Sequence, residues 1–436
     1  MLVFVFESSD LARAHATKAN LAYVAPEWNV QFVAAGNAEA LNEHLRDYDL
    51  PFCITLQAGD LLHESFLPEL AERLEALPED SAGLIYERGN PEFPDAPLVW
   101  RTRAVQSMGF PFFPASDRLP FDTYMLHDAM FALRTRWTWQ SVSSSWWKPH
   151  IPYVPKWQKK QEEWELVRPI LETSLSSNDL VEPQKKAQTS PQISIALCTY
   201  NNADYLLWSV RSILAQTADD WELILIDDAS TDLTQTKLTD LRQDPRIRIF
   251  TNPVNLGKSH CLNLALSVCR APWLVELDAD DWLPPEGVRA LLDSAQQAAP
   301  ETSLLYGDYY EWTERARKGL IFGGIRKAPA TIEANDLLRR ALPVAPRCYR
   351  VATLQKIGGW LVDAPYEGRL YEDFEIIIRL SQSSAFRYVA QPLYHRRIRA
   401  SSITHLHAEK YADWMKWMAL GAANRQGDRG DVPPSS

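Results

Sequence analysis

The sequence predicts an α/β protein with two tandem domains, each built around a mainly parallel sheet. Three observations lead to this prediction. Residues 193–394 alternate short apolar runs with stretches of helical periodicity, and residues 1–150 repeat several of their patterns in the same order. The length of 436 residues also exceeds what one hydrophobic core usually serves. With 46% apolar residues, a mainly disordered chain is excluded.

In the second half, apolar runs expected to be strands alternate with expected helices. ISIALCTY, which begins at Ile193, is apolar at nearly every position, as a parallel strand covered on both faces is. Asn202 and Asp204 then supply N-cap chemistry for a helix with one apolar face. Further expected strands are WELILIDD, RIRIFTN and WLVELDADD, and SHCLNLALSVC is an expected helix. This alternation is typical of a doubly wound sheet, which binds ligands at the carboxyl ends of its strands.

A segment of different composition, charged and polar, separates the two halves. Residues 151–192 contain a charged stretch expected to be a helix, followed by a polar, Pro-containing linker. We therefore expect one domain at 1–150 and a second at 193–407. Residues 408–436 are expected to form a helix and a disordered tail.

The first 150 residues resemble a worn copy of the second half. EWNVQFVAAGN aligns with DWELILIDDAS, and FCITLQAGDLL aligns with WLVELDADDWL. VWRTRAVQSMG aligns with CYRVATLQKIG, and LHDAMFALR aligns with YEDFEIIIR. Four matches in one order indicate internal duplication, and a chance alignment of general α/β patterns is the alternative.

Composition narrows the partners and the compartment. A net charge of −11 argues against general binding to nucleic acids or anionic membranes. The five Cys residues show no CxxC spacing, so we expect neither a disulfide framework nor a structural zinc site. No apolar run reaches the roughly 20 residues that span a bilayer, and the start of the chain lacks signal-peptide features. We expect a cytoplasmic protein, either free or peripheral at the inner face of the membrane.

Two acidic clusters follow expected strands. Asp278 and Asp280 stand where both carboxylates can converge on one hard cation, although a capped turn before Pro284 would use the same residues. Asp227 and Asp228 end another strand, where a carboxylate can accept hydrogen bonds from a nucleobase or a ribose. A helix N-cap is the alternative for this second pair.

Two further clusters lie at expected helix starts. Lys258 in NLGK precedes a helix whose N-terminus suits a phosphate, although many helices begin in this way. Glu372 and Asp373 open the helical stretch FEIIIRL. A carboxylate there is either a simple cap or a general base that removes a proton from an acceptor hydroxyl.

Together, these segments resemble the family 2 inverting glycosyltransferases, which have the GT-A fold. CTYNN, DDAST, NLGKSHCLN, DADD and YEDFEIIIRL occur in the order and approximate spacing of that family, over about residues 193–407. The resemblance implies transfer of a hexosyl or N-acetylhexosaminyl group from a nucleoside diphosphate sugar, with a UDP-sugar favoured. The acceptor would be a glycan, a lipid-linked molecule or a protein, as in polysaccharide biosynthesis for the cell envelope.

The resemblance also implies roles for individual residues. Asp373 would be the catalytic base, and Glu372 would orient the acceptor. Asp280 would bind Mn²⁺ or Mg²⁺, with Asp278 nearer the ribose and His395 completing the metal shell; a structural role is the alternative for His395. The residues implied for nucleotide-sugar binding are Thr199, Tyr200, Asn201, Asp228, Lys258, Asp278 and Ala279.

Most of this chemistry is missing from residues 1–150. Gln57 and Gly59 align with the two metal-side carboxylates of DADD, and Ala34 and Ala35 align with the acidic pair of DDAST. Gln and Gly cannot anchor a divalent cation. We therefore expect a degenerate GT-A-like domain without catalysis, which serves packing, formation of a homo-oligomer or holding of an extended acceptor.

Two other function classes stay open. A nucleotidyltransferase that makes an activated sugar also uses acidic metal ligands on an α/β sheet, but it carries a Gly-rich loop after its first strand, and CTYNNADY has no Gly. A non-catalytic protein that binds a glycan or a partner is the other. The intact DADD and YEDFE argue against this second class. Arg396, Arg397 and Arg399 could contact a diphosphate or an anionic acceptor, or form a solvated basic loop.

Overall fold

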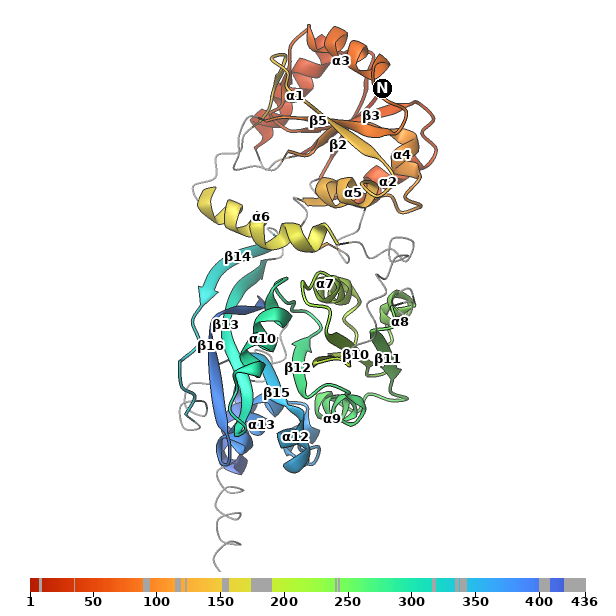
Figure 1. Cartoon of the computed structure of the whole chain (residues 1–436). Helices are drawn as coiled ribbons and strands as arrows, with labels where there is room; N and C mark the ends of the chain where they lie inside the picture. Colours follow the sequence, from red (N-terminus) through yellow and green to blue (C-terminus); the bar gives the residue numbers. More distant parts are fainter. Residues whose placement is uncertain are drawn as a thin grey trace, which may run out of the picture. The chain divides into compact units, whose positions relative to one another are not determined.

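The computed structural model divides the chain into two compact units, Met1–Ser174 and Leu175–Ser436 (Figure 1). The structure describes residues 1–7, 10–34, 36–88, 95–113, 119–121, 124–150, 157–173, 190–239, 241, 244–315, 319–333, 337, 343–399 and 408–418. Most of the expected linker and the expected tail lie outside these residues. Among the described residues, no helix is long and apolar enough to cross a bilayer.

In the described part of the N-terminal unit, six strands form a mixed sheet in the order β2-β1-β3-β6-β5-β7. The strands are β1 (Leu2–Phe6), β2 (Asn29–Val33), β3 (Phe52–Gln57), β5 (Ser81–Tyr86), β6 (Pro97–Arg101) and β7 (Thr138–Val142). A separate ribbon joins β4 (Leu61–Leu62) to β8 (Trp147–Lys148). The helices are α1 (Leu11–Val24), α2 (Ala38–Arg46), α3 (Phe66–Glu75), α4 (Thr102–Gln106), α5 (Met125–Leu133) and α6 (Trp157–Leu171). Helices α1 and α3 pack through apolar residues on one face of the sheet (Figure 1).

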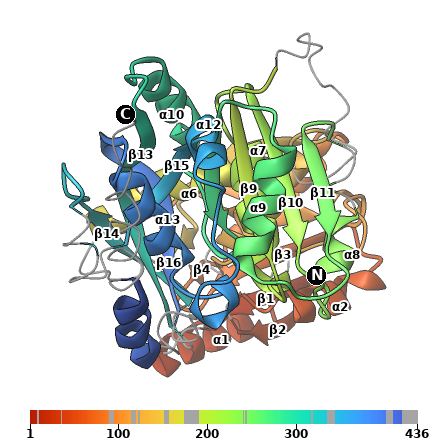
Figure 2. The ribbon, with the colours of Figure 1, turned by 90° about the horizontal axis from the view of Figure 1, so that it is seen from below.

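The C-terminal unit has a larger sheet in the order β11-β10-β9-β12-β15-β13-β14, and β16 pairs with β13. Figure 2 labels β13, β15, β9, β10 and β11 of this sheet, in an order that agrees with this pairing. The strands are β9 (Ile193–Thr199), β10 (Trp221–Asp227), β11 (Ile247–Thr251), β12 (Trp273–Asp278), β13 (Thr302–Arg315), β14 (Gly319–Arg326), β15 (Ala345–Arg350) and β16 (Ala385–Ile398). The first four coincide with the strands expected from the sequence.

Helices cover both faces of this second sheet. They are α7 (Ala203–Leu214), α8 (Thr234–Leu238), α9 (Lys258–Val268), α10 (Gly287–Gln296), α12 (Val351–Lys356) and α13 (Glu372–Ser381). A 3₁₀ turn, η3 (Pro365–Gly368), follows α12. A second one, η4 (Ala408–Lys410), directly precedes the helical residues 411–418. One core cluster joins α7 and α10 to the sheet, and another joins α9, α12 and α13 to it. The buried, apolar strands explain the near-continuous hydrophobic runs, because both sides of each strand are covered. The predicted α/β fold class is confirmed.

The two sheets share one strand order. In chain order, β1, β2, β3, β5, β6 and β7 occupy the places of β9, β10, β12, β13, β15 and β16. The pairing directions also agree: the first three strands are parallel, the fifth is antiparallel to its two neighbours, and the sixth is parallel to the fourth. Strands β11 and β14 have no counterpart among the described N-terminal strands.

Individual contacts repeat as well. Arg101 on β6 donates to the carbonyls of Ser81 and Pro78 and lies 5.0 Å from the ring of Phe52. Arg350 on β15 donates to the carbonyls of Thr302 and Ala299, and its guanidinium lies over Trp273. These two arginines hold the same strand ends together.

A buried aspartate repeats in the same manner. Asp60 accepts the backbone N–H of His150 at 2.6 Å, and Asp281 accepts the backbone N–H of Arg397 at 2.7 Å. Both carboxylates are buried, and Asp60 follows β3 by the same spacing as Asp281 follows β12. The second oxygen of Asp60 accepts the N–H of Gln57. This aspartate therefore belongs to the contacts that both units share and that support the fold, which we call the frame.

The substitution Asp60→Ala should destabilise the N-terminal unit by about 2–4 kcal/mol, because it leaves two buried backbone N–H groups without acceptors. Hydrogen exchange at the amides of Gln57 and His150 in the full-length chain measures this change. The exposed Glu27→Ala is the matched control and should change exchange by less than about 0.5 kcal/mol. Unchanged protection at both amides would contradict the structural role.

Candidate active site

The carboxyl ends of three parallel strands meet at one edge of the C-terminal sheet. The register places Thr199 of β9 beside Asp227 of β10, and Cys198 beside Asp278 of β12. Two residues just beyond these ends have positive φ angles, Asn201 at 51° and Ala229 at 62°. Left-handed backbone at non-glycine residues costs energy and is concentrated at functional sites. These two residues therefore indicate a functional site at this edge of the sheet.

Asn201 ties the loop after β9 to the loop after β10. Its side-chain oxygen accepts the N–H groups of Thr231 at 2.8 Å and Asp232 at 3.3 Å, and its own N–H donates to the hydroxyl of Ser230. Its predicted neighbours differ in environment: the Tyr200 side chain is exposed, whereas Thr199 is buried. The Thr199 hydroxyl has no hydrogen-bond partner among the described residues.

Asp228 holds the loop that leads into α9. One carboxylate oxygen accepts from the Asn252 amide at 2.7 Å and from the N–H of Leu256 at 2.9 Å. The other accepts the N–H of Gly257 at 2.7 Å. Asp228 is buried and satisfied by these donors, so the structure gives it a positioning task for Lys258. Its predicted contact with a nucleobase stays a prediction.

Lys258, at the start of α9, gathers three carboxylates. Its ammonium pairs with Glu276 at 2.8 Å, with Glu372 at 3.3 Å and with Asp278. Two of these acids lie on β12, and the third opens α13, 94 positions after Asp278 in the chain. The structure thus brings the predicted residues Asp278 and Glu372 to the predicted Lys258.

Arg347 on β15 is the second cation of this cluster. It donates two hydrogen bonds to Glu276, at 2.9 and 3.0 Å. The same guanidinium reaches Asp278 at 3.2 Å and Asp373 at 3.1 Å. It therefore connects the carboxylate predicted to lie near the ribose with the predicted catalytic base. We call Lys258, Glu276, Asp278, Arg347, Glu372 and Asp373 the charge cluster.

The sequence analysis missed Glu276 and Arg347. Both lie inside strands, WLVELD and APRCYR, and both are buried. A charged residue in the middle of a buried strand needs a partner of opposite charge, because unpaired burial of an ion is very costly. A charged residue within a strand is therefore a sequence signal for a buried ion pair. The identity of the partner comes only from the antiparallel pairing of β12 with β15, which sets Glu276 opposite Arg347.

The cluster sets the protonation of its members. Burial would raise the pKa of Asp278, but the Lys258 ammonium and the Arg347 guanidinium outweigh it and hold that pKa well below its usual range. Burial would likewise lower the pKa of Lys258, and the carboxylates of Asp278, Glu276 and Glu372 outweigh it and raise that pKa. Both groups are therefore charged at neutral pH.

Glu372 differs from the other acids. Burial raises its pKa to about 7; Asp373 and Glu276 add to this rise, and Lys258 opposes it. The carboxyl group of Glu372 therefore exchanges its proton near neutral pH. The backbone just before it is strained as well, because Tyr371 has a φ angle of 62°.

Asp280 lies in a second group of charges. Its carboxylate pairs with Arg399 at 2.6 Å, and the guanidinium of Arg399 lies 4.5 Å from the ring of Tyr205. Arg397 also lies over this ring, at 4.7 Å, and is buried. Two of its guanidinium nitrogens have no hydrogen-bond partner among the described residues. Ala279 contributes only its backbone carbonyl, which accepts from Ser209.

His395 lies in the aromatic core beside this group. Its ring stacks on Trp282 at 5.0 Å and on Tyr310 at 4.5 Å, and its Nδ1 accepts a hydrogen bond from Trp312. Burial lowers its pKa well below the usual value, so the ring is neutral. Nε2 has no hydrogen-bond partner among the described residues, and a metal contact of this atom stays a prediction.

The carboxylates fit a divalent cation in part. The side chains of Asp278 and Asp280 are 32% and 20% exposed, so both reach solvent. Among the described residues, no three His, Cys, Asp or Glu side chains gather closely enough to hold a metal ion by themselves. Hard cations accept oxygen ligands from phosphates and water as well as from carboxylates. The carboxylates of the described residues would therefore supply only part of the ligands of such a cation.

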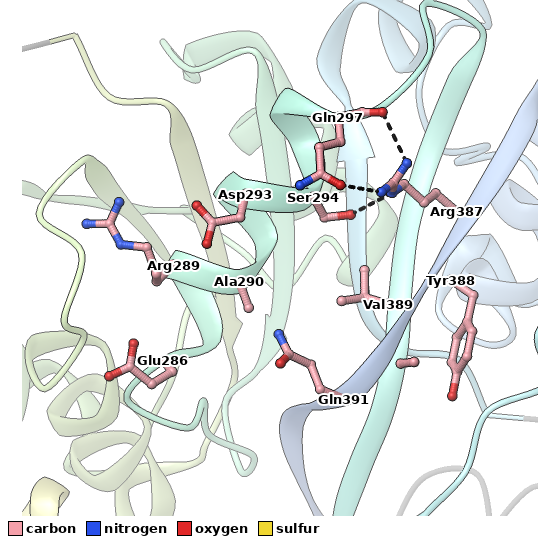
Figure 3. Close-up of a pocket in the computed structure, with 11 residues that line it drawn as sticks. Glu286, Arg289, Ala290, Asp293, Ser294, Gln297, Arg387, Tyr388, Val389 and Gln391 are labelled. Carbon is pink, nitrogen blue, oxygen red and sulfur yellow. Dashed lines mark hydrogen bonds between the residues drawn. The ribbon is translucent and has the colours of Figure 1, made fainter.

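A polar hollow of about 480 Å³ lies elsewhere in this unit, between α10 and β16. Figure 3 shows Arg387 at its rim, where it donates to Ser294 and Gln297. None of the sequence-predicted site residues lines it. We assign the candidate active site to the strand ends, because the charges and the strained backbone lie there.

Comparisons with known proteins concern the same C-terminal unit. The model of the family "Glycosyl transferase family 2" matches residues 194–353. An uncharacterized glycosyltransferase of Haemophilus influenzae is 32% identical over 35% of this chain and 46% of its own length. The succinoglycan biosynthesis protein ExoO of Rhizobium meliloti is 27% identical over 34% of this chain and 44% of its own length. The matched segment thus spans less than half of either relative.

Solved structures overlap the chain only partly. S. aureus TarS 1–349 in complex with UDP-GlcNAc has a TM-score of 0.41 and 17% identity, over 52% of this chain and 66% of that one. The mannosyltransferase PcManGT from Pyrobaculum calidifontis, in complex with GDP-Man and Mn²⁺, has a TM-score of 0.36 and 18% identity, over 63% and 72%. The family model and these relatives therefore show that residues 194–353, within the C-terminal unit, are similar to glycosyl transferase family 2.

Proposed function

We propose that the C-terminal unit transfers a sugar from a nucleoside diphosphate sugar to a hydroxyl group of a growing polysaccharide, with inversion at the anomeric carbon. One observation carries this proposal: Arg347 joins Asp373, the predicted base, to Asp278 at the end of β12. A single displacement requires the base and the donor to be held in fixed relative positions, and a side chain that contacts both sides supports this. A non-catalytic protein has no need of this arrangement.

In the proposed reaction, Asp373 accepts the proton of the attacking hydroxyl. The acceptor oxygen forms a bond to the anomeric carbon while the bond to the diphosphate oxygen breaks, and the diphosphate leaves with the electron pair. Asp373 is suited to this task because its side chain is 26% exposed, whereas Arg347 behind it is nearly buried. An acceptor can therefore reach the carboxylate from the solvent side.

The leaving group meets cations of this chain. Arg397 and Arg399 lie beside Asp280 with N–H groups that lack partners among the described residues, and such buried donors favour an anion. Asp280 and Asp278 would hold Mn²⁺ or Mg²⁺, which, when bound, neutralises charge that develops on the diphosphate. UDP is the first nucleotide to test, because the motif resemblance favours it.

The names of the matched relatives favour a polysaccharide as the acceptor. Besides the succinoglycan protein, matched relatives include an O-antigen biosynthesis protein of Myxococcus xanthus and the chondroitin synthases of Escherichia coli and Pasteurella multocida. We infer a glycan chain as the acceptor class. A nucleotidyltransferase is the less favoured candidate, because no Gly-rich phosphate loop follows β9.

We also infer that the N-terminal unit is a degenerate copy without turnover. Gly59 stands where the C-terminal unit has Asp280, with a φ angle of 107°. A Cβ atom at this position would lie 2.7 Å from the imidazole of His150. The ring therefore fills the space that a metal-binding side chain would need, which supports a role in packing, oligomerisation or acceptor holding.

Asp280→Ala should abolish metal-dependent nucleotide binding, because the proposed cation loses a carboxylate ligand. Calorimetric titration of the full-length chain with UDP, with and without Mn²⁺, measures this. The exposed Asp363→Ala is the control and should bind as the wild type does. Equal binding of UDP with and without metal in the wild type would contradict the proposed cation. Two binding sites per chain would contradict the degenerate copy.

Asp373→Asn should retain UDP binding and reduce turnover by about 10²–10⁴-fold, the usual contribution of a general base. Release of UDP from a panel of UDP-sugars, with water or a glycan as acceptor, measures turnover. A variant that turns over at the wild-type rate would remove Asp373 from the role of base.

Glu372→Gln should stabilise the protein more at pH 8 than at pH 5. The folded-state pKa of about 7 lies above the ordinary value of 4.5, so the folded state binds more protons than the unfolded state in this window. The free energy of unfolding then falls as the pH rises from about 5 to about 8, and the neutral amide avoids this loss. Urea unfolding of both proteins across this range tests the trend, with the exposed Glu301→Gln as control. A difference that shrinks toward pH 8 would be the wrong sign.

A further inference from the structure

We infer that Arg347 is a positioning residue for catalysis: it sets the direction of the Asp373 carboxylate relative to Asp278, and the fold does not require it. This inference rests on the proposed function of the C-terminal unit. It assigns a role to a residue that none of the sequence motifs contains.

The contacts of Arg347 leave its guanidinium little freedom. Two parallel hydrogen bonds to Glu276 fix the plane of the group, and Glu276 is itself buried in β12. A guanidinium is a rigid planar fork, so fixing one side of it also fixes where its remaining N–H groups point. Those groups reach Asp278 at 3.2 Å and Asp373 at 3.1 Å.

Asp373 has few other restraints. It lies at the first turn of α13, and its second oxygen accepts the backbone N–H of Phe374 at 2.9 Å. The bond from Arg347 is the contact that comes from the sheet. Because the base and Asp278 belong to different elements, a shared side chain is what relates their positions to each other.

The N-terminal unit is a natural control for the fold. Its sheet keeps the strand order, and it keeps the frame contacts of Arg101 and Asp60. Yet Thr55 stands at the place of Glu276 and Leu98 at the place of Arg347, counted from the paired strand ends Phe52–Arg101 and Trp273–Arg350. The hydroxyl of Thr55 bonds within its own sheet, to the indole of Trp100 and the carbonyl of Pro97.

This comparison separates two roles. A residue needed for the frame is kept in both units, as Arg350 and Arg101 are. The Glu276–Arg347 pair is absent from the unit that also lacks the two metal-side carboxylates of DADD. Replacing a buried ion pair by residues that pack without charge is often neutral for stability, whereas removing one partner is strongly destabilising. Both members must therefore be changed together.

The double variant Glu276→Thr/Arg347→Leu reproduces the N-terminal arrangement and tests the inference. Its Tm should stay within about 5 °C of the wild type, because no buried charge loses its only partner. Binding of UDP with Mn²⁺ should persist, since Asp278 keeps Lys258 and Asp280 is unchanged. The kcat for release of UDP from the donor should fall about 100-fold with the KM for the donor within about threefold, as expected for a misplaced base.

Arg347→Lys is a second variant that keeps the charge. A lysine cannot bond Glu276 in the same planar manner, so kcat should fall while binding of UDP remains. Arg350→Lys on the same strand is the matched control, because Arg350 contacts only carbonyls and a ring. It should lower Tm and leave kcat of the folded protein unchanged.

The outcomes divide cleanly. A folded double variant with wild-type kcat would overturn the positioning role, and so would an equal loss of kcat in Arg347→Lys and Arg350→Lys. If the double variant does not fold while Arg347→Lys retains wild-type kcat, Arg347 serves the fold and the inference is wrong. A wild-type protein that neither binds any nucleoside diphosphate nor releases one from a sugar donor contradicts the proposed function instead.

Discussion

Compensation of buried charge at the end of β12 is the constraint on which the C-terminal unit depends. Glu276 is buried in the strand, and Asp278, Glu372 and Asp373 lie around its end. Uncompensated, such a group of carboxylates would cost several kcal/mol for each buried ion. Lys258 and Arg347 provide the compensation, so the site exists only when the segments that carry these cations dock against β12.

Each supporting segment is placed by contacts of its own. Asp228 accepts the N–H groups of Leu256 and Gly257 and so delivers Lys258 to the cluster. The antiparallel pairing of β15 with β12 sets Arg347 opposite Glu276. These backbone hydrogen bonds therefore also affect the candidate active site, because they determine the positions of Lys258 and Arg347.

Comparison of the two units distinguishes the contacts that support the shared fold from those that belong to the candidate active site. Both sheets use an arginine at the end of β6 or β15 and a buried aspartate after β3 or β12, and these contacts are the same in kind and nearly the same in length. The Glu276–Arg347 ion pair of the charge cluster is not repeated, because Thr55 and Leu98 stand in its place. A sheet of this order is thus stable with Thr55 and Leu98 in place of an ion pair, which shows that the fold tolerates either solution.

The sequence by itself determined the fold class, the strands from β9 to β12 and the polar residues at their ends, because hydrophobic period and strand-end motifs are local signals. Its motifs also located the segment that the glycosyl transferase family 2 model matches. Only the tertiary structure decided how these residues pair: Arg347 and Glu276 are 71 positions apart and carry no motif. It also showed that Asp228 is satisfied by backbone N–H groups and that the ring of His395 is stacked between aromatic side chains. Partner choice for a buried charge depends on which strands become neighbours, and that information is not contained in any short stretch of chain.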